Sequence, residues 1–268
     1  MGKVFIVDQE LCNGCYGCQI ACKDETVGNE WPPYSRSQPV TGHFWCRVRQ
    51  WDHGQVPKVR VEYKPTFCNH CAEAACMAAA PDAVYRRDDG LVIIDPEKAV
   101  GNRALVDACP YGSIYWNEEL ELPQKCTGCA HLVDEGKVPH CVDVCVTGAL
   151  RFGDEEDFAD EIAAAEVVRA EGVSGQRVYY LNAPKLFIGG EVWDPAEDEV
   201  IEGARVTLTF PDGSVASTET DGFGDFWFRR IEAGSYRLAI EAEGFAGVER
   251  DVELTESLNV GDFPLERA

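Results

Sequence analysis

The most informative stretch of this chain lies near its start and reads Cys12-Asn13-Gly14-Cys15-Tyr16-Gly17-Cys18-Gln19-Ile20-Ala21-Cys22. In a run spaced C-x2-C-x2-C-x3-C, the first three thiolates ligate one [4Fe–4S] cluster and the fourth ligates another. Cys22 lies about one helical turn beyond Cys18, so its side chain points away from the first cluster. The run therefore predicts a partner group of cysteines elsewhere in the chain.

A partner group is present between residues 126 and 145. It begins with a C-x2-C pair and ends with Cys141 and Cys145, which repeat the x3 spacing of Cys18 and Cys22. Each run then supplies three ligands to its own cluster and one to its neighbour's, which holds two clusters close together for electron transfer. We expect cluster A on Cys12, Cys15, Cys18 and Cys145, and cluster B on Cys22, Cys126, Cys129 and Cys141.

A third group of cysteines comprises Cys68, Cys71 and Cys76 and needs a distant fourth ligand. Cys109, in the segment Cys109-Pro110-Tyr111-Gly112, is the well-placed candidate and completes an expected cluster C. Three clusters of four ligands then use twelve of the thirteen cysteines in the chain. Cys46 is left over, and we expect it to be a buried, small apolar residue, as free cysteines usually are.

Four positions mark a further cluster site whose ligands are absent. In a complete two-cluster unit a Cys-Pro pair would follow Cys76, and here that pair reads Ala80-Pro81. A C-x2-C-x2-C run would also precede Cys109. A random loss would leave stray cysteines, so we expect that one whole site was lost and that the hairpin around Asp88-Asp89-Gly90 survives beside it. The residues at the lost site are Ala80, Ala99, Asn102 and Leu105.

Two other interpretations of the cysteines agree less well with their spacing. Structural zinc sites usually pair two short Cys/His elements and do not use a triple C-x2-C-x2-C run. Disulfide frameworks are typical of short secreted chains. This chain has 268 residues, and its first residues, MGKVFIVD, are typical of a strand and not of an export signal.

The four cysteine groups, in this order, resemble the four-cluster ferredoxin subunits that accompany molybdopterin enzymes of the dimethyl-sulfoxide-reductase family. The resemblance covers roughly residues 1–184. The chain departs from the family at the empty site and at Val146, where a proline often follows the last cysteine. The further shared motifs are Tyr63-x-Pro65-x2-Cys68-x-His70-Cys71, Cys126-x2-Cys129-x-His131 and Val178-Tyr179-Tyr180-Leu181.

This resemblance implies an α+β, ferredoxin-like double bicluster domain with a non-catalytic role in electron transfer. The partner would be a large molybdopterin catalytic subunit that holds the molybdenum and the substrate, so we expect no catalytic residue in this chain. In the family the clusters form a chain that runs away from the molybdenum subunit. We expect the missing site to lie inside that chain and to set cluster C apart. His70 and His131 are expected to lie near clusters and to tune their potentials.

The composition excludes several classes of partner. A formal net charge of −23 argues against binding to nucleic acid or to an anionic membrane surface. No apolar run is long enough to span a bilayer, so membrane contact would need another subunit. Abundant thiols and the lack of an export signal favour the reducing cytoplasm.

The sequence changes character near Pro184. Residues 1–184 are expected to form the ferredoxin-type domain, with a long insertion at 23–67. Residues 185–268 contain no cysteine and are expected to form a second domain.

The second domain shows short alternating strands separated by turns such as Pro211-Asp212-Gly213, which predicts an all-β fold of about seven strands. The pattern Thr220-Asp221-x2-Gly224-x-Phe226 resembles the carboxypeptidase-regulatory and transthyretin-like β-sandwich. We expect a stabilising or docking module, with carbohydrate or peptide binding as the alternative.

Three functions are compatible with these features. A ferredoxin-type subunit with an added sandwich resembles the small subunits of molybdenum transhydroxylases, which move a hydroxyl between phenols. The first alternative is the electron-transfer subunit of another molybdenum reductase or dehydrogenase. The second is an interaction protein whose clusters serve only as a structural scaffold.

Overall fold

The computed structural model describes residues 2–166, 170–171 and 173–268. The chain divides into two compact units. The first unit contains the chain up to Gln50 and then Tyr63–Ala183. The second unit contains Trp51–Glu62 and Pro184–Ala268. Part of the insertion at 23–67 therefore lies in the second unit, although we expected it within the ferredoxin-type domain.

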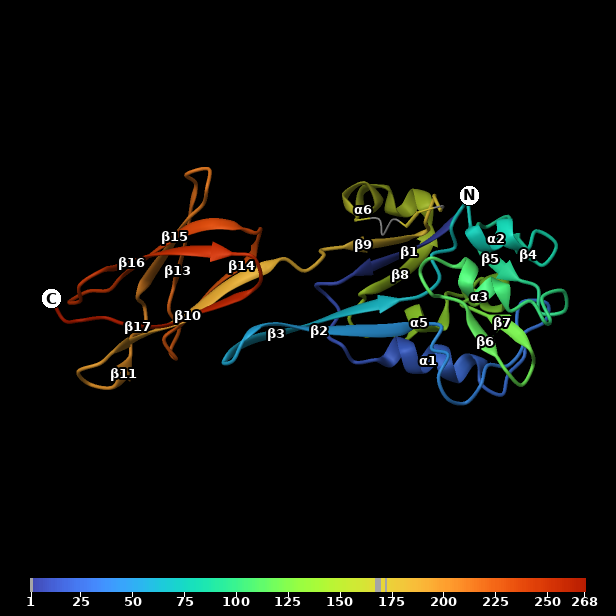
Figure 1. Cartoon of the computed structure of the whole chain (residues 1–268), viewed down its shortest axis with the longest axis horizontal. Helices are drawn as coiled ribbons and strands as arrows, with labels where there is room; N and C mark the ends of the chain where they lie inside the picture. Colours follow the sequence, from blue (N-terminus) through green and yellow to red (C-terminus); the bar gives the residue numbers. More distant parts are fainter. Residues whose placement is uncertain (1, 167–169, 172) are drawn as a thin grey trace. The chain divides into compact units, whose positions relative to one another are not determined.

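The first unit is organised around β1 (Lys3–Asp8), the middle strand of a three-stranded sheet. β8 (Leu150–Asp154) pairs with it in antiparallel fashion and β9 (Val178–Leu181) pairs with it in parallel (Figure 1). All four apolar residues from Val4 to Val7 are buried. Such a continuous apolar run is typical of a strand that is covered on both faces. The sheet thereby joins the N-terminal segment to two segments from far along the chain.

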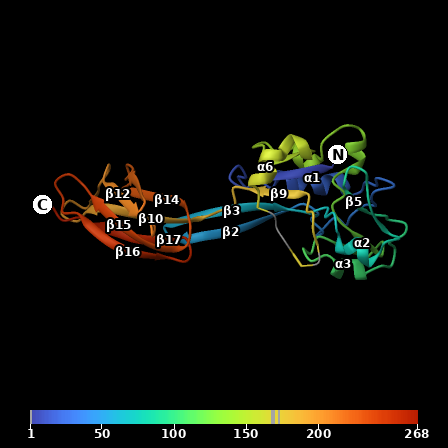
Figure 2. The ribbon, with the colours of Figure 1, turned by 90° about the horizontal axis from the view of Figure 1, so that it is seen from above.

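Short helices follow the cysteine runs. α1 (Gly17–Thr26) packs against α5 (His140–Asp143) (Figure 1). α2 (Ala75–Ala79) lies beside α3 (Ala104–Ala108) (Figure 2). No helix in the described part of the chain is long and apolar enough to cross a membrane. The other elements of this unit are β4 (Val84–Arg86) paired with β5 (Val92–Ile94), β6 (Tyr115–Asn117) paired with β7 (Leu122–Gln124), α4 (Ala130–Asp134), the 3-10 helix Glu155–Phe158 and α6 (Ala159–Ala164).

The pairing of β4 with β5 confirms the hairpin predicted around Asp88-Asp89-Gly90. Gly90 has a φ of 88°, which favours glycine at this turn.

Cysteines form part of the hydrophobic core of the first unit. One cluster of buried side chains joins Phe5 and Val7 of β1 to Trp45 and to the cysteines 18, 22, 46, 68, 126 and 141. Burying a thiolate is costly unless its charge is compensated. The core therefore requires that these thiols be neutralised, either by protons or by a bound metal.

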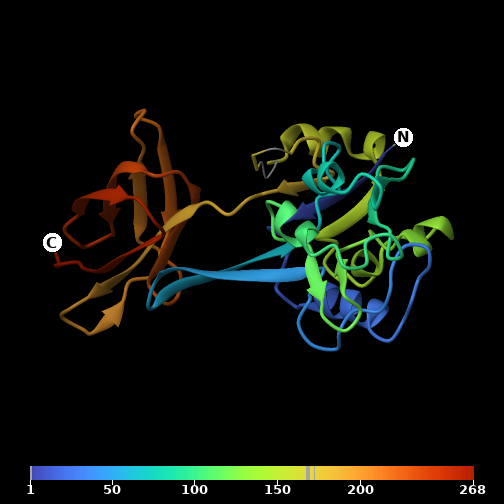
Figure 3. The same cartoon turned by 45° about the vertical axis from the view of Figure 1, so that its right-hand side comes forward.

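The second unit contains two four-stranded sheets that share one core (Figure 3). In one sheet, β10 (Leu186–Asp194) pairs with β14 (Asp225–Ile231) in antiparallel fashion, with β17 (Leu258–Pro264) in parallel, and with the short β11 (Glu199–Val200). The other sheet has the order β13-β12-β15-β16, and all its neighbours are antiparallel. Its strands are β12 (Arg205–Thr209), β13 (Val215–Glu219), β15 (Gly234–Glu241) and β16 (Val248–Leu254).

Alternate residues of these strands face the shared core, as a period of two predicts. Val206, Leu208, Leu238 and Ile240 are 0% exposed. Residues 184–268 are all described, and they form eight strands where we expected about seven. The difference is β11, which has two residues and is too short to produce an alternating pattern.

A hairpin from the insertion contributes to the second unit. It is formed by β2 (Arg47–Gln55) and β3 (Lys58–Thr66). The Gln55 amide donates to the carbonyl of Ser257 at 3.2 Å, and its oxygen accepts the N–H of Asn259 at 2.7 Å. Gln55 thereby satisfies two backbone groups at the start of β17.

Two further contacts stabilise the turn of this hairpin. The ammonium group of Lys58, which is 5% exposed, pairs with the carboxylate of Asp225 at the start of β14. Gly54 has a φ of 87°, and a Cβ at this position would lie 2.5 Å from the ring of Phe187. The backbone of the turn therefore packs directly on that ring, and only glycine fits there without strain.

We predict that Gly54→Ala weakens the second unit by about 2–4 kcal/mol, because left-handed strain and overpacking add. Hydrogen–deuterium exchange of the β10 and β17 amides measures this loss. Gly42→Ala is the matched control, since Gly42 also has a positive φ of 68° but a Cβ there meets nothing within 4 Å. Equal exchange in the two variants would contradict the proposed contact.

Candidate metal centres

The thiols expected to hold cluster A meet at the surface of the first unit. Gly14, with a φ of 69°, bends the cysteine run before α1. Burial raises the pKa of Cys12, and the thiolates of Cys18, Cys145 and Cys15 raise it further. Cys12 and Cys145 are half-buried and Cys15 is exposed. The structure thus brings these four residues together at a solvent-accessible edge.

The thiols expected to hold cluster B are enclosed. Cys22, Cys126, Cys129 and Cys141 are all buried. Burial raises the pKa of Cys22 well above its usual value, and the other three thiolates add to this effect. Burial also raises the pKa of Cys126 to about 12, with a further contribution from Cys141. Four buried thiolates at such short range are stable only if positive charge compensates them, and iron would supply that charge.

The thiols expected to hold cluster C line a common cavity. Cys68, Cys71, Cys76 and Cys109 all border it, and it contains about 350 Å³ of unfilled space, part of which is open to solvent. Burial raises the pKa of Cys71 to about 12, and the thiolates of Cys68, Cys109 and Cys76 contribute. Four thiols around one cavity match the ligand set of a cubane cluster.

None of the thirteen cysteines forms a disulfide bond. Within the described ranges, no three His, Cys, Asp or Glu side chains form a group that could hold a single metal ion. A cubane binds each cysteine to a different iron atom, so its four ligands stand further apart than those of one ion.

Cys46 lies between the thiols of the first two groups. It is 1% exposed, which agrees with the expectation of a buried residue. Hydrogen bonds to the sulfur atoms of Cys141 and Cys18, together with burial, raise the pKa of Cys46 well above its usual value. The bond to Cys18 lowers the pKa of that ligand. The Cys46 thiol therefore faces one sulfur atom of each of the first two groups, a contact that its spacing in the sequence did not reveal.

The second and third thiol groups are neighbours. Burial is the main cause of the raised pKa of Cys126. The Cys141 thiolate raises this pKa further, and the Cys68 thiolate also contributes. Cys68 and Cys126 also share one cluster of buried side chains. Our expectation that a missing site separates cluster C from the others was therefore wrong. Spacing indicates which cysteines share a cluster, but it does not give the order of the clusters in space.

Apolar side chains occupy three of the four positions at which we expected a lost site. Ala99 and Leu105 are 0% exposed and Ala80 is 8% exposed. They form a small core with Cys76, and Cys109 packs against it. Asn102 is half-buried, and its N–H donates to the carbonyl of Ala99 at 3.0 Å. The lost site therefore borders the third group and lies at the end of the series of thiol groups. The other buried members of this core are Ala83, Val84, Val92, Ile94, Ile114 and Leu122.

A carboxylate from α1 organises the two histidines beside the second group. One oxygen of Glu25 lies 2.8 Å from Nε2 of His131, and the other lies 2.8 Å from Nδ1 of His140. The Trp31 ring stacks on His131 with 4.2 Å between ring centroids. Glu25 is 106 residues from His131 in the chain, so no local pattern could have indicated this pairing.

His70 lies beside a ligand of the third group. Its backbone N–H lies 3.4 Å from the sulfur of Cys68 and donates to it. Its ring accepts the N–H of Val92 at 3.0 Å through Nδ1. The side chain is 0% exposed, and burial holds its pKa well below the usual value, so the ring is neutral.

Two family models match the sequence. Residues 59–155 match a 4Fe-4S dicluster domain, and residues 188–266 match a carboxypeptidase regulatory-like domain. The second match agrees with the β-sandwich class expected for residues 185–268.

Relatives with known names align with two thirds or more of this chain. The pyrogallol hydroxytransferase small subunit of Pelobacter acidigallici is 37% identical, over 97% of this chain and 98% of that protein. A subunit of the tetrathionate reductase of Salmonella typhimurium is 31% identical, over 68% and 73% respectively. A component of the anaerobic dimethyl sulfoxide reductase of Escherichia coli is 36% identical, over 67% and 88%. The chain therefore belongs to this family of iron–sulfur subunits of molybdopterin oxidoreductases, which confirms the resemblance inferred from its cysteine groups.

We predict that Cys46→Ala retains the full iron content but lowers the reduction potential of cluster A or cluster B, because the ligand that accepts the single S–H of Cys46, Cys18 or Cys141, loses a hydrogen bond. Iron and sulfide analysis and an EPR-monitored redox titration measure the two effects. Cys126→Ala is the control and should lose about a third of the iron. Loss of iron from Cys46→Ala in the same proportion would contradict the assignment of Cys46 as a non-ligand.

We predict that Leu105→Ala destabilises the first unit by about 3 kcal/mol, because it opens a cavity in a packed core. Hydrogen–deuterium exchange of residues 92–109 reports the change. Val100→Ala, at a side chain that is 57% exposed, should change stability by less than about 0.5 kcal/mol. Similar effects of the two substitutions would show that the emptied site is not a core.

Proposed function

We propose that the protein holds three [4Fe–4S] clusters and transfers electrons as the small subunit of a molybdopterin enzyme. The observation that supports this most strongly is that twelve of the thirteen cysteines gather into three groups of four. The ligand sets are those expected: A on Cys12, Cys15, Cys18 and Cys145; B on Cys22, Cys126, Cys129 and Cys141; C on Cys68, Cys71, Cys76 and Cys109. When bound, the clusters would accept and release single electrons.

The partner is a large molybdopterin catalytic subunit, which we place against the edge that carries cluster A. Cys15 is exposed there, and three exposed apolar side chains adjoin the group A cysteines in the sequence. Leu11 is 47% exposed, Ile20 59% and Val146 82%. Apolar side chains of this kind are common at subunit interfaces. Clusters B and C would then follow cluster A away from the partner.

The favoured reaction of the complex is the conversion of pyrogallol to phloroglucinol by hydroxyl transfer. The support for it is the relative named above, which aligns with nearly the whole chain, including the β-sandwich. This conversion has no net electron change, so the clusters would set the oxidation state of the molybdenum and would not carry electrons at every turnover. The substrate site would lie in the partner, and this chain would contribute no catalytic residue.

A second candidate is the electron-transfer subunit of another molybdenum reductase or dehydrogenase. The proximity of Cys68 to Cys126, which share one cluster of buried side chains, favours it, because it would make A, B and C a continuous series. The missing site at the end of that series would not interrupt transfer among the remaining three. The β-sandwich would act as a stabilising or docking module in either case, and a chain so rich in cysteines without disulfide bonds suits the reducing cytoplasm.

Anaerobic purification of the native complex tests the proposal. Native mass spectrometry should show this protein with three clusters bound to a molybdenum-containing partner. The complex should convert pyrogallol to phloroglucinol without an external electron acceptor. Turnover that requires an external acceptor or donor would instead support a reductase or dehydrogenase. A protein that purifies alone, without a molybdenum partner, would refute both candidates.

A further inference from the structure

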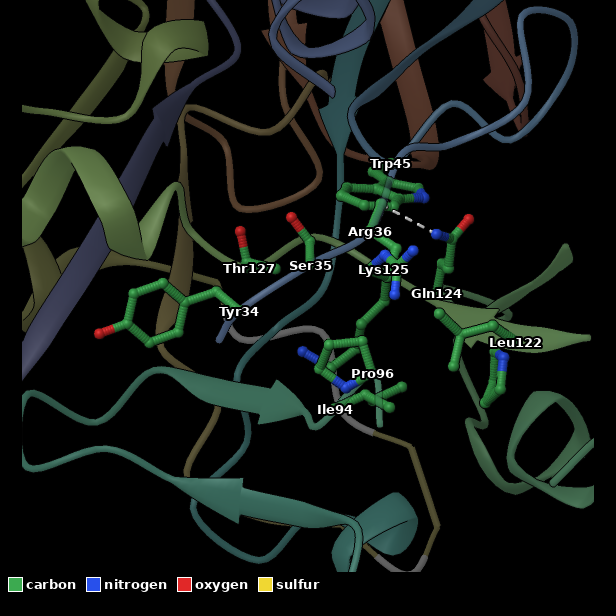
Figure 4. Close-up of a pocket in the computed structure, with 11 residues that line it drawn as sticks. Tyr34, Ser35, Arg36, Trp45, Ile94, Pro96, Leu122, Gln124, Lys125 and Thr127 are labelled. Carbon is green, nitrogen blue, oxygen red and sulfur yellow. Dashed lines mark hydrogen bonds between the residues drawn. The ribbon is translucent and has the colours of Figure 1, made fainter. Parts of the chain in front are cut away.

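Lys125 is a buried cation beside the cysteine groups. It precedes Cys126 directly and is 3% exposed. Its ammonium group donates to the carbonyl of Val92 and, at 3.0 Å, to the carbonyl of Cys126. Figure 4 shows it in a small pocket that Trp45 and Gln124 also line.

Lys125 has no carboxylate partner in the part of the chain that the structure describes. Lys58, a buried lysine of the second unit, shows the usual arrangement, because Asp225 neutralises it. An ammonium group buried with only carbonyl oxygens as partners retains most of its desolvation cost. A counter-charge is therefore expected close to Lys125.

The groups that can supply this counter-charge are the cysteine thiolates. Lys125 borders the cavity that the four cysteines of group C line. It lowers the pKa of Cys76 against the effect of burial, and it also lowers that of Cys126. Cys76 is in group C and Cys126 is in group B. Lys125 therefore lies where it acts on both groups at once.

We propose that Lys125 is a positioning residue whose fixed positive charge compensates clusters B and C together and raises both reduction potentials. Reduction adds one electron to a cluster that is already anionic, so a nearby cation in a poorly solvated site stabilises the reduced form more than the oxidised form. No bond is formed or broken. This inference rests on the proposed function, because it requires both clusters to be present.

Redox titration of the native complex, monitored by EPR, tests the role of Lys125. In Lys125→Met, the equilibrium constant for one-electron reduction of clusters B and C should fall at least tenfold, which is a shift of about 59 mV to more negative potential. Cluster A should shift less, because the Coulomb interaction weakens with distance. Lys125→Arg keeps the charge and should restore both potentials to nearly the wild-type values.

Two further variants separate charge from structure. Lys125→Gln keeps a hydrogen-bond donor without the charge and should lower the potentials as Lys125→Met does. Lys137→Met is the matched control, because Lys137 also lies in the segment of group B but its side chain is 64% exposed and solvent screens it. It should leave all potentials unchanged.

Iron and sulfide analysis of the wild-type complex comes first, because fewer than three clusters would refute the proposed function and not the role of Lys125 as such. Wild-type potentials in Lys125→Gln would overturn the role of the charge. An equal shift in Lys137→Met would also overturn it. If both neutral variants lose clusters while Lys125→Arg retains them at altered potentials, Lys125 serves assembly and not the potentials.

Discussion

Mutual repulsion of buried thiolates is the constraint on which the first unit depends. Neighbouring sulfur atoms and the loss of solvent together raise the pKa of Cys22, Cys71 and Cys126. A protein that packs its thiols this way has a core that is stable only when the thiols are protonated or bound to metal. In the proposed ligand sets, Cys22 and Cys145 are exchanged between the first and last cysteine runs, so the two clusters would hold two distant segments together. Metal binding and folding would then be coupled in this unit.

At the positions where a fourth set of cysteines is absent, the chain has no thiolate repulsion to compensate. Where ligands would stand, Ala99 and Leu105 are completely buried, and hydrophobic packing replaces metal binding. The hairpin of β4 and β5 keeps its pairing beside this core. Loss of the site at the end of the series leaves groups A, B and C in sequence. The consequence for function is that the remaining groups still form a connected path, contrary to what the gap in the cysteine pattern suggested.

Residues that are not ligands connect the thiol groups to one another. Cys46 hydrogen-bonds to ligands of groups A and B, and Lys125 lies beside ligands of groups B and C. Glu25 holds two histidines next to group B. Because potentials depend on hydrogen bonds to sulfur and on nearby charge, these residues would give the protein separate means to adjust the three proposed clusters. The second unit has a core of its own, formed without any cysteine and completed by the hairpin residues 51–62.

The sequence by itself determined the cysteine groups, the class of the family and the β-sandwich, because each depends on spacing or alternation that is local in the chain. It could not determine that group C adjoins group B, since Cys68 and Cys126 lie 58 positions apart in the sequence and meet only in the buried core. Nor could it place Glu25 on His131 or Lys125 beside Cys76, because those side chains meet only after the segments pack. The hairpin residues 51–62 joined the second unit for the same reason, since Gln55 and Lys58 find their partners about 200 and 170 residues away. Tertiary structure decided these features, because electrostatic and packing contacts depend on distance in space and not on separation in the chain.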